Sequence, residues 1–278
     1  MRSFITKNEG YGDELAYESL LNEVEFSFST LHQYEQCPYA FYLKKIDGTE
    51  INEGNFYSDA GGYMHEVLEM IFSGKLPVDD AIPYYIENYS NSVVYETKQS
   101  TMEKKYNQAV DFLAAFDMTQ LDNYEILGVE KEVHFELDGY KFIGFIDLLL
   151  RNKQTKKIII VDHKSSDHFL KKDGSPLKNQ QANFEAYSKQ MYLYSKAVFD
   201  KYGEYPDRIV WNHFFDQQVT NIPFKYEDYC ATQQWALNII RRIYTDENFD
   251  AVQNYMMCKV LCGYRNSCCY ATEESENN

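Results

Sequence analysis

The chain has 278 residues, of which 44% are hydrophobic and 16% aromatic, a composition typical of a globular protein with a substantial core. No apolar run reaches the roughly 18 residues that a membrane span needs, and residues 1–10 lack the apolar centre of a signal peptide, so we expect a cytoplasmic protein without a membrane partner. The net charge of −16 excludes a grip on DNA by bulk positive charge, although lysines cluster at 153–172. No linker rich in proline, glycine or serine divides the chain, which predicts a single domain over 1–278.

Residues 26–48 predict two short helices. Ser29 is the expected N-cap of a helix that ends at Gln36, and Pro38 suits the first turn of the helix that follows. Cys37 lies at the junction, where a thiolate can point away from both helices.

An amphipathic helix is predicted over 58–73, because apolar residues recur on one face. These residues are Met64, Leu68, Ile71 and Phe72. His65 lies at the edge of this apolar stripe, and by itself that position indicates a hydrogen-bonded core histidine. The pattern of 77–123 predicts further packed helices, which form an insertion.

The segment 128–164 predicts three consecutive strands. The first alternates apolar and polar residues up to Leu137, which is the period of a half-buried strand. Asp138-Gly139 is a strong hairpin signal, and the nearly apolar run 140–150 after it predicts a central strand buried on both faces. The β-branched run 157–161 predicts the third strand.

Two aspartates and a lysine lie close together if these strands pair as expected. With a turn centred on Gln154 and Thr155, Asp147 lies across from Asp162, with Cβ atoms roughly 5 Å apart. Period two puts Lys164 on the same side as Asp162. Carboxylates this close repel unless one is protonated or a cation lies between them, and hard oxygen ligands favour Mg²⁺ or Mn²⁺. A buried aspartate–lysine ion pair without metal is the alternative.

Beyond these strands we expect a loop over 167–183 that is rich in lysine and glutamine. This loop either lies along the backbone of a substrate or is simply solvated, and a helix over 184–199 follows it. Gln190 and Tyr194 are four residues apart on that helix and share one face. Further strands are predicted at 208–215 and 221–226.

A last helix is predicted over 229–244. Cys230 near its start is interpreted as a plain buried thiol, and His213 on the strand before it as a structural histidine.

Five of the six cysteines form a candidate ligand set, in which Cys37 joins four cysteines within 255–270. The four are Cys258, Cys262, Cys268 and Cys269. Clustered thiols in a reducing compartment favour metal over disulfide. Four thiolates suit either zinc or an iron–sulfur cluster, and the spacing alone does not choose between them.

Four motifs together resemble one family. GFIDLL (144–149) followed by IIIVDHKSS (158–166) is similar to the core of the PD-(D/E)XK nucleases, in particular of their RecB-like exonuclease branch. GGYMHEVLE (61–69) resembles the histidine motif of that branch, KQMYLYSKA (189–197) its Q-x-x-x-Y motif, and 26–48 its N-terminal helix. The matching parts are 26–48, 58–73, 128–199 and 255–270. The resemblance implies an α/β, restriction-endonuclease-like fold, in which helices flank a central mixed sheet and the nuclease core spans 128–226.

The resemblance also implies a site for Mg²⁺ or Mn²⁺. The implied ligands are His65, Asp147, Asp162 and the main-chain carbonyl of His163. Lys164 is implied to position the attacking water, and Gln190 and Tyr194 to orient the lysine and the substrate. Asp162 stands where many members have glutamate, but the motif allows both.

For the cysteines, the resemblance implies a 4Fe-4S cluster like that of the helicase-nuclease subunit AddB and the CRISPR-associated exonucleases. One cysteine before the histidine motif joins three at the C-terminal end in that plan, here Cys37, Cys258, Cys262 and Cys268, with Cys269 as the alternative to Cys268. The first C-terminal gap has three residues where two are usual, so zinc stays an alternative.

The expected function is that of a metal-dependent DNA exonuclease acting on single-stranded or frayed ends, in recombination, repair, or DNA processing related to CRISPR or phage. A helicase, a recombination protein or a CRISPR protein is the implied partner. The alternative, favoured by the acidity of the chain, is a non-catalytic scaffold of the same fold that binds DNA ends or a protein partner.

Overall fold

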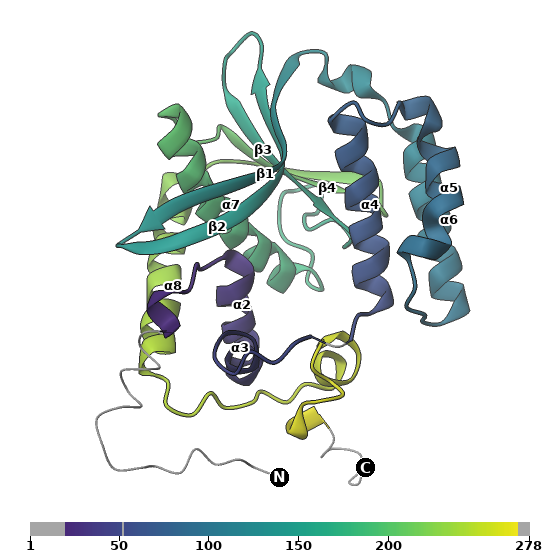
Figure 1. Cartoon of the computed structure of the whole chain (residues 1–278). Helices are drawn as coiled ribbons and strands as arrows, with labels where there is room; N and C mark the ends of the chain where they lie inside the picture. The colour runs from purple at the N-terminus through teal and green to yellow at the C-terminus, as the bar shows by residue number, and fades with distance from the viewer. Residues whose placement is uncertain (1–19, 52, 272–278) are drawn as a thin grey trace, which may run out of the picture.

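The computed structural model describes residues 20–51 and 53–271, and a five-stranded mixed sheet lies at its centre (Figure 1). In order across the sheet, the strands are β1 (Tyr124–Leu137), β2 (Tyr140–Asn152), β3 (Ile158–Lys164), β4 (Arg208–His213) and β5 (Gln218–Pro223). Neighbouring strands are antiparallel except for β3 and β4. These two are parallel because the helix α7 (Gln181–Tyr202) connects them, as a crossover must.

Two hairpins set the register of the central strand β2. The first closes at Asp138 and Gly139, whose φ angles of 52° and 84° are the left-handed values that an Asp-Gly turn supplies. In the second, Leu148 pairs with Val161. The predicted register is therefore confirmed, and one step further along the same register Asp147 lies across from Asp162.

Helices pack against the sheet through separate apolar cores. The helices α2 (Phe28–Gln36), α7 and α8 (Tyr226–Thr245) share one core with the sheet, which includes Ile146, Ile160 and Trp211. The helices α4 (Phe56–Phe72), α5 (Ala81–Ser92) and α6 (Gln99–Ala115) form a second core at the other side of the molecule (Figure 1). The restriction-endonuclease-like α/β architecture expected from the sequence is thus present.

The first described helix starts earlier than predicted. Ser27, not Ser29, is the N-cap of α2, because its hydroxyl accepts a hydrogen bond from the Thr30 N–H at 3.1 Å. The buried side chain of Phe28 explains the shift, since the apolar face of the helix begins there. The next helix, α3 (Pro38–Lys45), begins at Pro38 as predicted.

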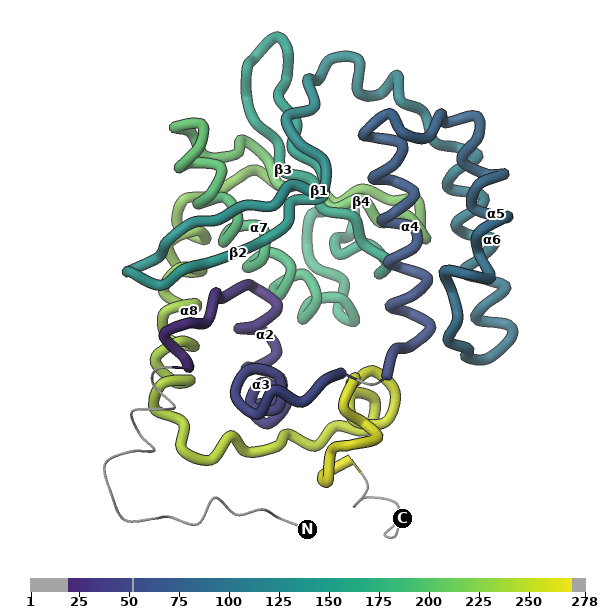
Figure 2. The backbone as a smooth tube through the Cα atoms, in the orientation of Figure 1, coloured from purple at the N-terminus to yellow at the C-terminus, as the bar shows by residue number. Residues whose placement is uncertain are grey.

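Residues 77–123 contain the predicted helices. They fold into η1 (Val78–Asp80), α5, α6 and η2 (Met118–Leu121), and their tyrosines pack together, as in the edge-on rings of Tyr89 and Tyr106 at 4.8 Å. In Figure 2 the pair α5 and α6 lies outside α4, on the side away from α7.

Two predictions near the end of the chain are wrong. Cys230 is exposed rather than buried, because Tyr229 faces the core and the next helical position points about 100° away from it. The strand expected over 221–226 begins instead at Gln218, directly after a tight turn in which Gln217 has a φ of 55°.

After α8 the chain returns toward the N-terminal helices. It forms the short helices η3 (Met257–Leu261) and η4 (Cys269–Ala271) beside α3 and the start of α4 (Figure 1). Among the described residues, no helix combines the length and the apolarity that crossing a membrane requires.

Candidate active site

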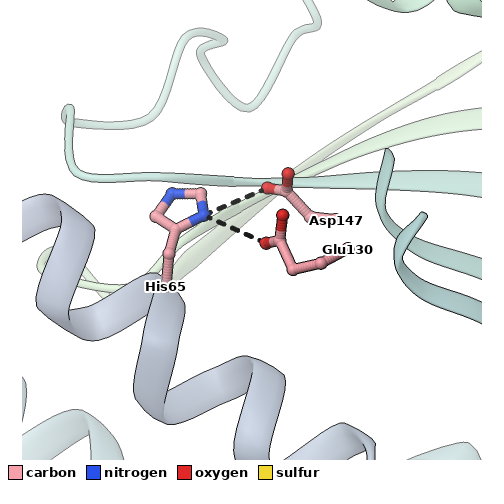
Figure 3. Close-up of side chains that lie close together, drawn as sticks. All are labelled: His65, Glu130 and Asp147. Carbon is pink, nitrogen blue, oxygen red and sulfur yellow. Dashed lines mark ion pairs between the residues drawn. The ribbon is translucent and has the colours of Figure 1, made fainter. Parts of the chain in front are cut away.

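A histidine and two carboxylates meet where α4 approaches the β1–β2 pair. The Nδ1 atom of His65 lies 3.4 Å from Oδ2 of Asp147 and 3.8 Å from Oε1 of Glu130 (Figure 3). One ligand atom from each residue lies within 4.8 Å of those of the other two, and each residue is partly or fully shielded from solvent. Nitrogen and oxygen donors in this arrangement suit a divalent ion such as Mn²⁺ or Mg²⁺.

Glu130 reaches this cluster through an interruption of the strand pairing. Val129 pairs with Leu148 and Lys131 with Ile146, so Glu130 lies across from Asp147. Its φ of 41° is unusual for a residue with a side chain, and it breaks the regular ladder at this point. Such backbone strain is common where a side chain must be directed into a functional site.

Glu130 is not among the residues predicted for the site. The alternation of β1 places it on the polar face of a half-buried strand and offers no sign of a local distortion. The hairpin at Asp138-Gly139 was the usable signal, because extending its register along both strands brings residues 130 and 147 face to face.

Asp147 is buried and held by the main chain of the third strand. The His163 N–H donates to its Oδ2 at 2.6 Å. Burial, followed by the charge of Asp162, raises the pKa of Asp147 to about 7, although His65, Lys164 and the His163 N–H lower it. A carboxyl in this position gains most from a cation that replaces its proton.

His65 experiences opposing effects. Burial favours its neutral form, but the carboxylates of Glu130, Asp147 and Asp162 outweigh that effect and raise its pKa. Without metal, the neighbouring carboxylates therefore favour the protonated form of the imidazole.

Lys164 is held from three sides at the end of β3. Its Nζ lies 2.6 Å from Oδ2 of Asp162, donates to Oε1 of Gln190 at 3.2 Å, and lies 4.1 Å from the centre of the Tyr187 ring. Burial would lower its pKa, but Asp162 and the other negative groups around it raise the pKa instead. The amine is therefore a cation at neutral pH and a hydrogen-bond donor.

Tyr187 is a second residue of the site that is not among the predicted site residues. It lies one helical turn before Gln190 on α7, so three-residue spacing from a candidate site residue was the available signal. Its ring also stacks on Phe169, with centroids 5.7 Å apart.

Tyr194 lies deeper than Gln190 on the same face of α7. Its ring lies against Gly144 of β2, so closely that a Cβ there would come within 2.4 Å of a ring carbon. Burial, followed by the charge of Asp162, raises its pKa, so the hydroxyl stays protonated. Gly144, the glycine of the GFID motif, therefore leaves the space that the Tyr194 ring occupies.

His163 points its side chain away from Lys164. Its buried ring stacks on Phe72 at 5.5 Å, and its Nδ1 lies 3.1 Å from the amide nitrogen of Asn212. Burial lowers its pKa well below the ordinary value, so the ring is neutral. The main-chain N–H of His163 reaches Asp147, and the His163 ring packs edge-on against the His65 ring at 5.9 Å.

The cysteines from the two ends of the described chain converge on a cavity of about 370 Å³. Its lining includes Cys37, Cys258, Cys262 and Cys268. Cys269 is not part of that lining; its Sγ lies 4.0 Å from the Tyr39 hydroxyl. Burial raises the pKa of the Cys262 and Cys268 thiols, and neighbouring thiols add to the effect.

Comparison with known proteins identifies the family. The model of the PD-(D/E)XK nuclease superfamily matches residues 25–269, and the chain belongs to this superfamily. A crystal structure of a protein from Eubacterium rectale, provisionally described as an exonuclease, superposes with a TM-score of 0.50 and 14% identity, covering 98% of this chain and 96% of that one. The structure of SSO0001 is 15% identical over 94% of this chain and 98% of that one, and it superposes with a TM-score of only 0.36. No curated protein matches the sequence.

Proposed function

We propose that this chain is a metal-dependent DNA exonuclease of the RecB-like branch. The observation that supports this best is the cluster of His65, Glu130 and Asp147 around one point, with the Asp162–Lys164 pair beside it. A divalent ion bound there would polarise a phosphoryl oxygen and lower the pKa of a bound water.

The fit of the residues to such an ion is good. Asp147 is buried with a raised pKa, so it carries an electrostatic cost that a cation removes. We assign His65, Glu130, Asp147, Asp162 and the carbonyl of His163 as ligands. Glu130 is the addition to the set expected from the sequence.

Lys164 acts in this proposal as a fixed donor rather than as a base. Its raised pKa keeps the proton on Nζ at neutral pH, so the amine can hold an attacking water or a phosphate oxygen but cannot accept a proton from it. Gln190 and Tyr187 fix the amine in place, and the protonated Tyr194 packs beneath the metal site.

Single strands or frayed ends are the proposed substrate, because a chain of net charge −16 lacks the broad positive surface that an intact duplex favours. A role in recombination, repair, or processing related to CRISPR or phage, beside a helicase or another partner, follows from the family resemblance alone. We further propose one nuclease domain with an insertion over 77–123.

The cysteine cavity is proposed to hold a 4Fe-4S cluster that joins the two ends of the domain. Four thiols that line one cavity can ligate either zinc or an iron–sulfur cluster, and the family resemblance is what favours the cluster here. Around it, Arg265 binds the Gly54 carbonyl at 2.6 Å and Tyr270 packs edge-on against Tyr39, which ties the same two segments together.

The test is a nuclease assay on an end-labelled single strand with Mn²⁺ or Mg²⁺. We expect degradation by the wild type, loss of about 100-fold or more with Asp147→Asn or Lys164→Ala, and unchanged activity with Asp138→Asn at the exposed hairpin turn. If wild type and all variants leave the DNA intact while the protein is folded and metal is present, the scaffold alternative replaces the nuclease proposal.

A further inference from the structure

Between β3 and α7 the chain forms a small hairpin, which we call the finger (residues 169–177). Leu170 and Pro176 form an antiparallel bridge, Lys171 N–H donates to Ser175 O at 2.8 Å, and Leu177 N–H donates to Phe169 O at 2.8 Å. The turn is closed by Gly174 N–H to Lys171 O, with Gly174 at a φ of 81°. The segment, for which the sequence leaves open a loop along the substrate backbone or a solvated loop, is therefore an ordered hairpin.

The finger exposes more positive than negative charge. Lys171 and Lys172 are exposed at its turn, and Lys178 follows it. The lysine ion pairs of the described part of the chain belong to Lys75, Lys164, Lys189 and Lys196 instead. The one acid of the finger, Asp173, already accepts hydrogen bonds from the N–H and the hydroxyl of Ser175. These hydrogen bonds, and to a lesser extent Lys171, lower the pKa of Asp173, so this acid offsets part of the charge, but the two lysines still leave the turn positive in a chain of net charge −16.

The base of the finger is connected to the proposed catalytic lysine. Phe169 is fully buried, and its ring stacks on Tyr187, whose other contact is the amine of Lys164 at 4.1 Å. Phe169 also packs edge-on against His213 at 4.4 Å, and its N–H donates to the Thr220 hydroxyl. Two ring contacts therefore separate the finger from Lys164. In the view of Figure 2, the segment hangs below the sheet between α7 and α4.

From these observations we infer that the finger is a contact for the phosphodiester backbone of a single DNA strand, with Lys171 and Lys172 each binding a phosphate next to the nucleotide that is cut. The inference rests on the proposed function. Lysine ammonium groups bind phosphate by releasing condensed counterions, and a turn that is already ordered loses little entropy on binding. The protein would thus bind the DNA backbone mainly through this turn, and the rest of its surface would stay acidic.

The salt dependence of binding tests the finger. In an Asp147→Asn background, which keeps the DNA intact, fluorescence anisotropy of a labelled single-stranded oligonucleotide is measured across a range of salt concentrations. The finger variant is Lys171→Gln with Lys172→Gln. Losing two phosphate contacts should reduce the slope of log K against log salt by about 1.4, and the affinity at 0.1 M salt by about 25-fold.

The matched control is Lys156→Gln with Lys157→Gln. These lysines are also adjacent, exposed and at a hairpin turn, that between β2 and β3, so the change in net charge is the same. We expect the control to change the slope by less than about 0.3. Equal slopes for the two variants, or no binding by the parent chain, overturn the inference.

Failure of the finger and failure of the proposed function are distinguishable. If the wild type degrades DNA but the finger and control variants bind it alike, the proposed function holds and the inference about the finger is wrong. If the chain binds DNA through the finger but cuts none with metal present, the inference about the finger holds and the proposed function is wrong.

Discussion

Glu130 and Asp147 lie across from each other on the neighbouring strands β1 and β2, and Glu130 has a left-handed backbone conformation. The distortion directs both carboxylates toward His65. The two strands therefore supply the acidic part of the site through their pairing, and α4 supplies the imidazole.

Replacing Glu130 by glutamine should weaken metal binding, because a neutral amide is a poorer ligand than a carboxylate and removes one negative charge from the cluster. We expect the Mn²⁺ concentration for half-maximal nuclease activity to rise at least about tenfold. Glu132→Gln is the control, since Glu132 is on the same strand with an exposed side chain. A Glu130 variant that titrates like the control would remove Glu130 from the ligand set.

The stability of the metal-free protein should fall as pH rises from about 4 to 7. Burial and the neighbouring Asp162 raise the pKa of Asp147 to about 7, above its unfolded value of about 3.9, so the folded state prefers the protonated carboxyl and loses that advantage as the pH passes through this window. Mn²⁺ competes with the same proton. Its stabilising effect should therefore be larger at pH 8 than at pH 5.5.

Thermal melts with EDTA or excess Mn²⁺ at several pH values measure this effect. Asp147→Asn is the reference, because the amide does not titrate, and the difference between the two proteins isolates this carboxyl. An increase in Tm on adding Mn²⁺ that is the same at pH 5.5 and pH 8 in the wild type would contradict the assignment of Asp147 as a ligand.

These strands also show how far the sequence predicts the structure. The Asp-Gly turn and the alternation of apolar residues predict the hairpins, and the register places Asp147 and Asp162 correctly, since pairing is a local consequence of turn chemistry. The same register also places Glu130 across from Asp147, but the alternation of β1 gives no sign of the left-handed backbone conformation that Glu130 adopts there. Tyr187 escapes prediction because its role depends on where a long lysine side chain comes to lie.

The ring of Tyr187 should matter more than its hydroxyl. The ammonium of Lys164 lies over the ring face, a contact of about 1–2 kcal/mol in a desolvated site, so Tyr187→Leu should lower kcat roughly 5- to 30-fold while KM changes little. Tyr187→Phe keeps the ring and should retain most of the activity. Equal loss in both variants, with intact folding by circular dichroism, would show that the hydroxyl is what matters.

The two adjacent cysteines at the C-terminal end of the described chain should differ in their effect on the proposed cluster. Cys268 lines the cavity with Cys37, Cys258 and Cys262, whereas Cys269 is exposed and lies near the Tyr39 hydroxyl. In anaerobically purified protein, Cys268→Ser should remove most of the iron and the visible absorbance and lower Tm, because the cluster joins segments that are far apart in sequence. Cys269→Ser should keep both. If Cys269→Ser loses the iron and Cys268→Ser does not, the fourth ligand is Cys269, and a colourless wild type that contains zinc would replace the iron–sulfur assignment altogether.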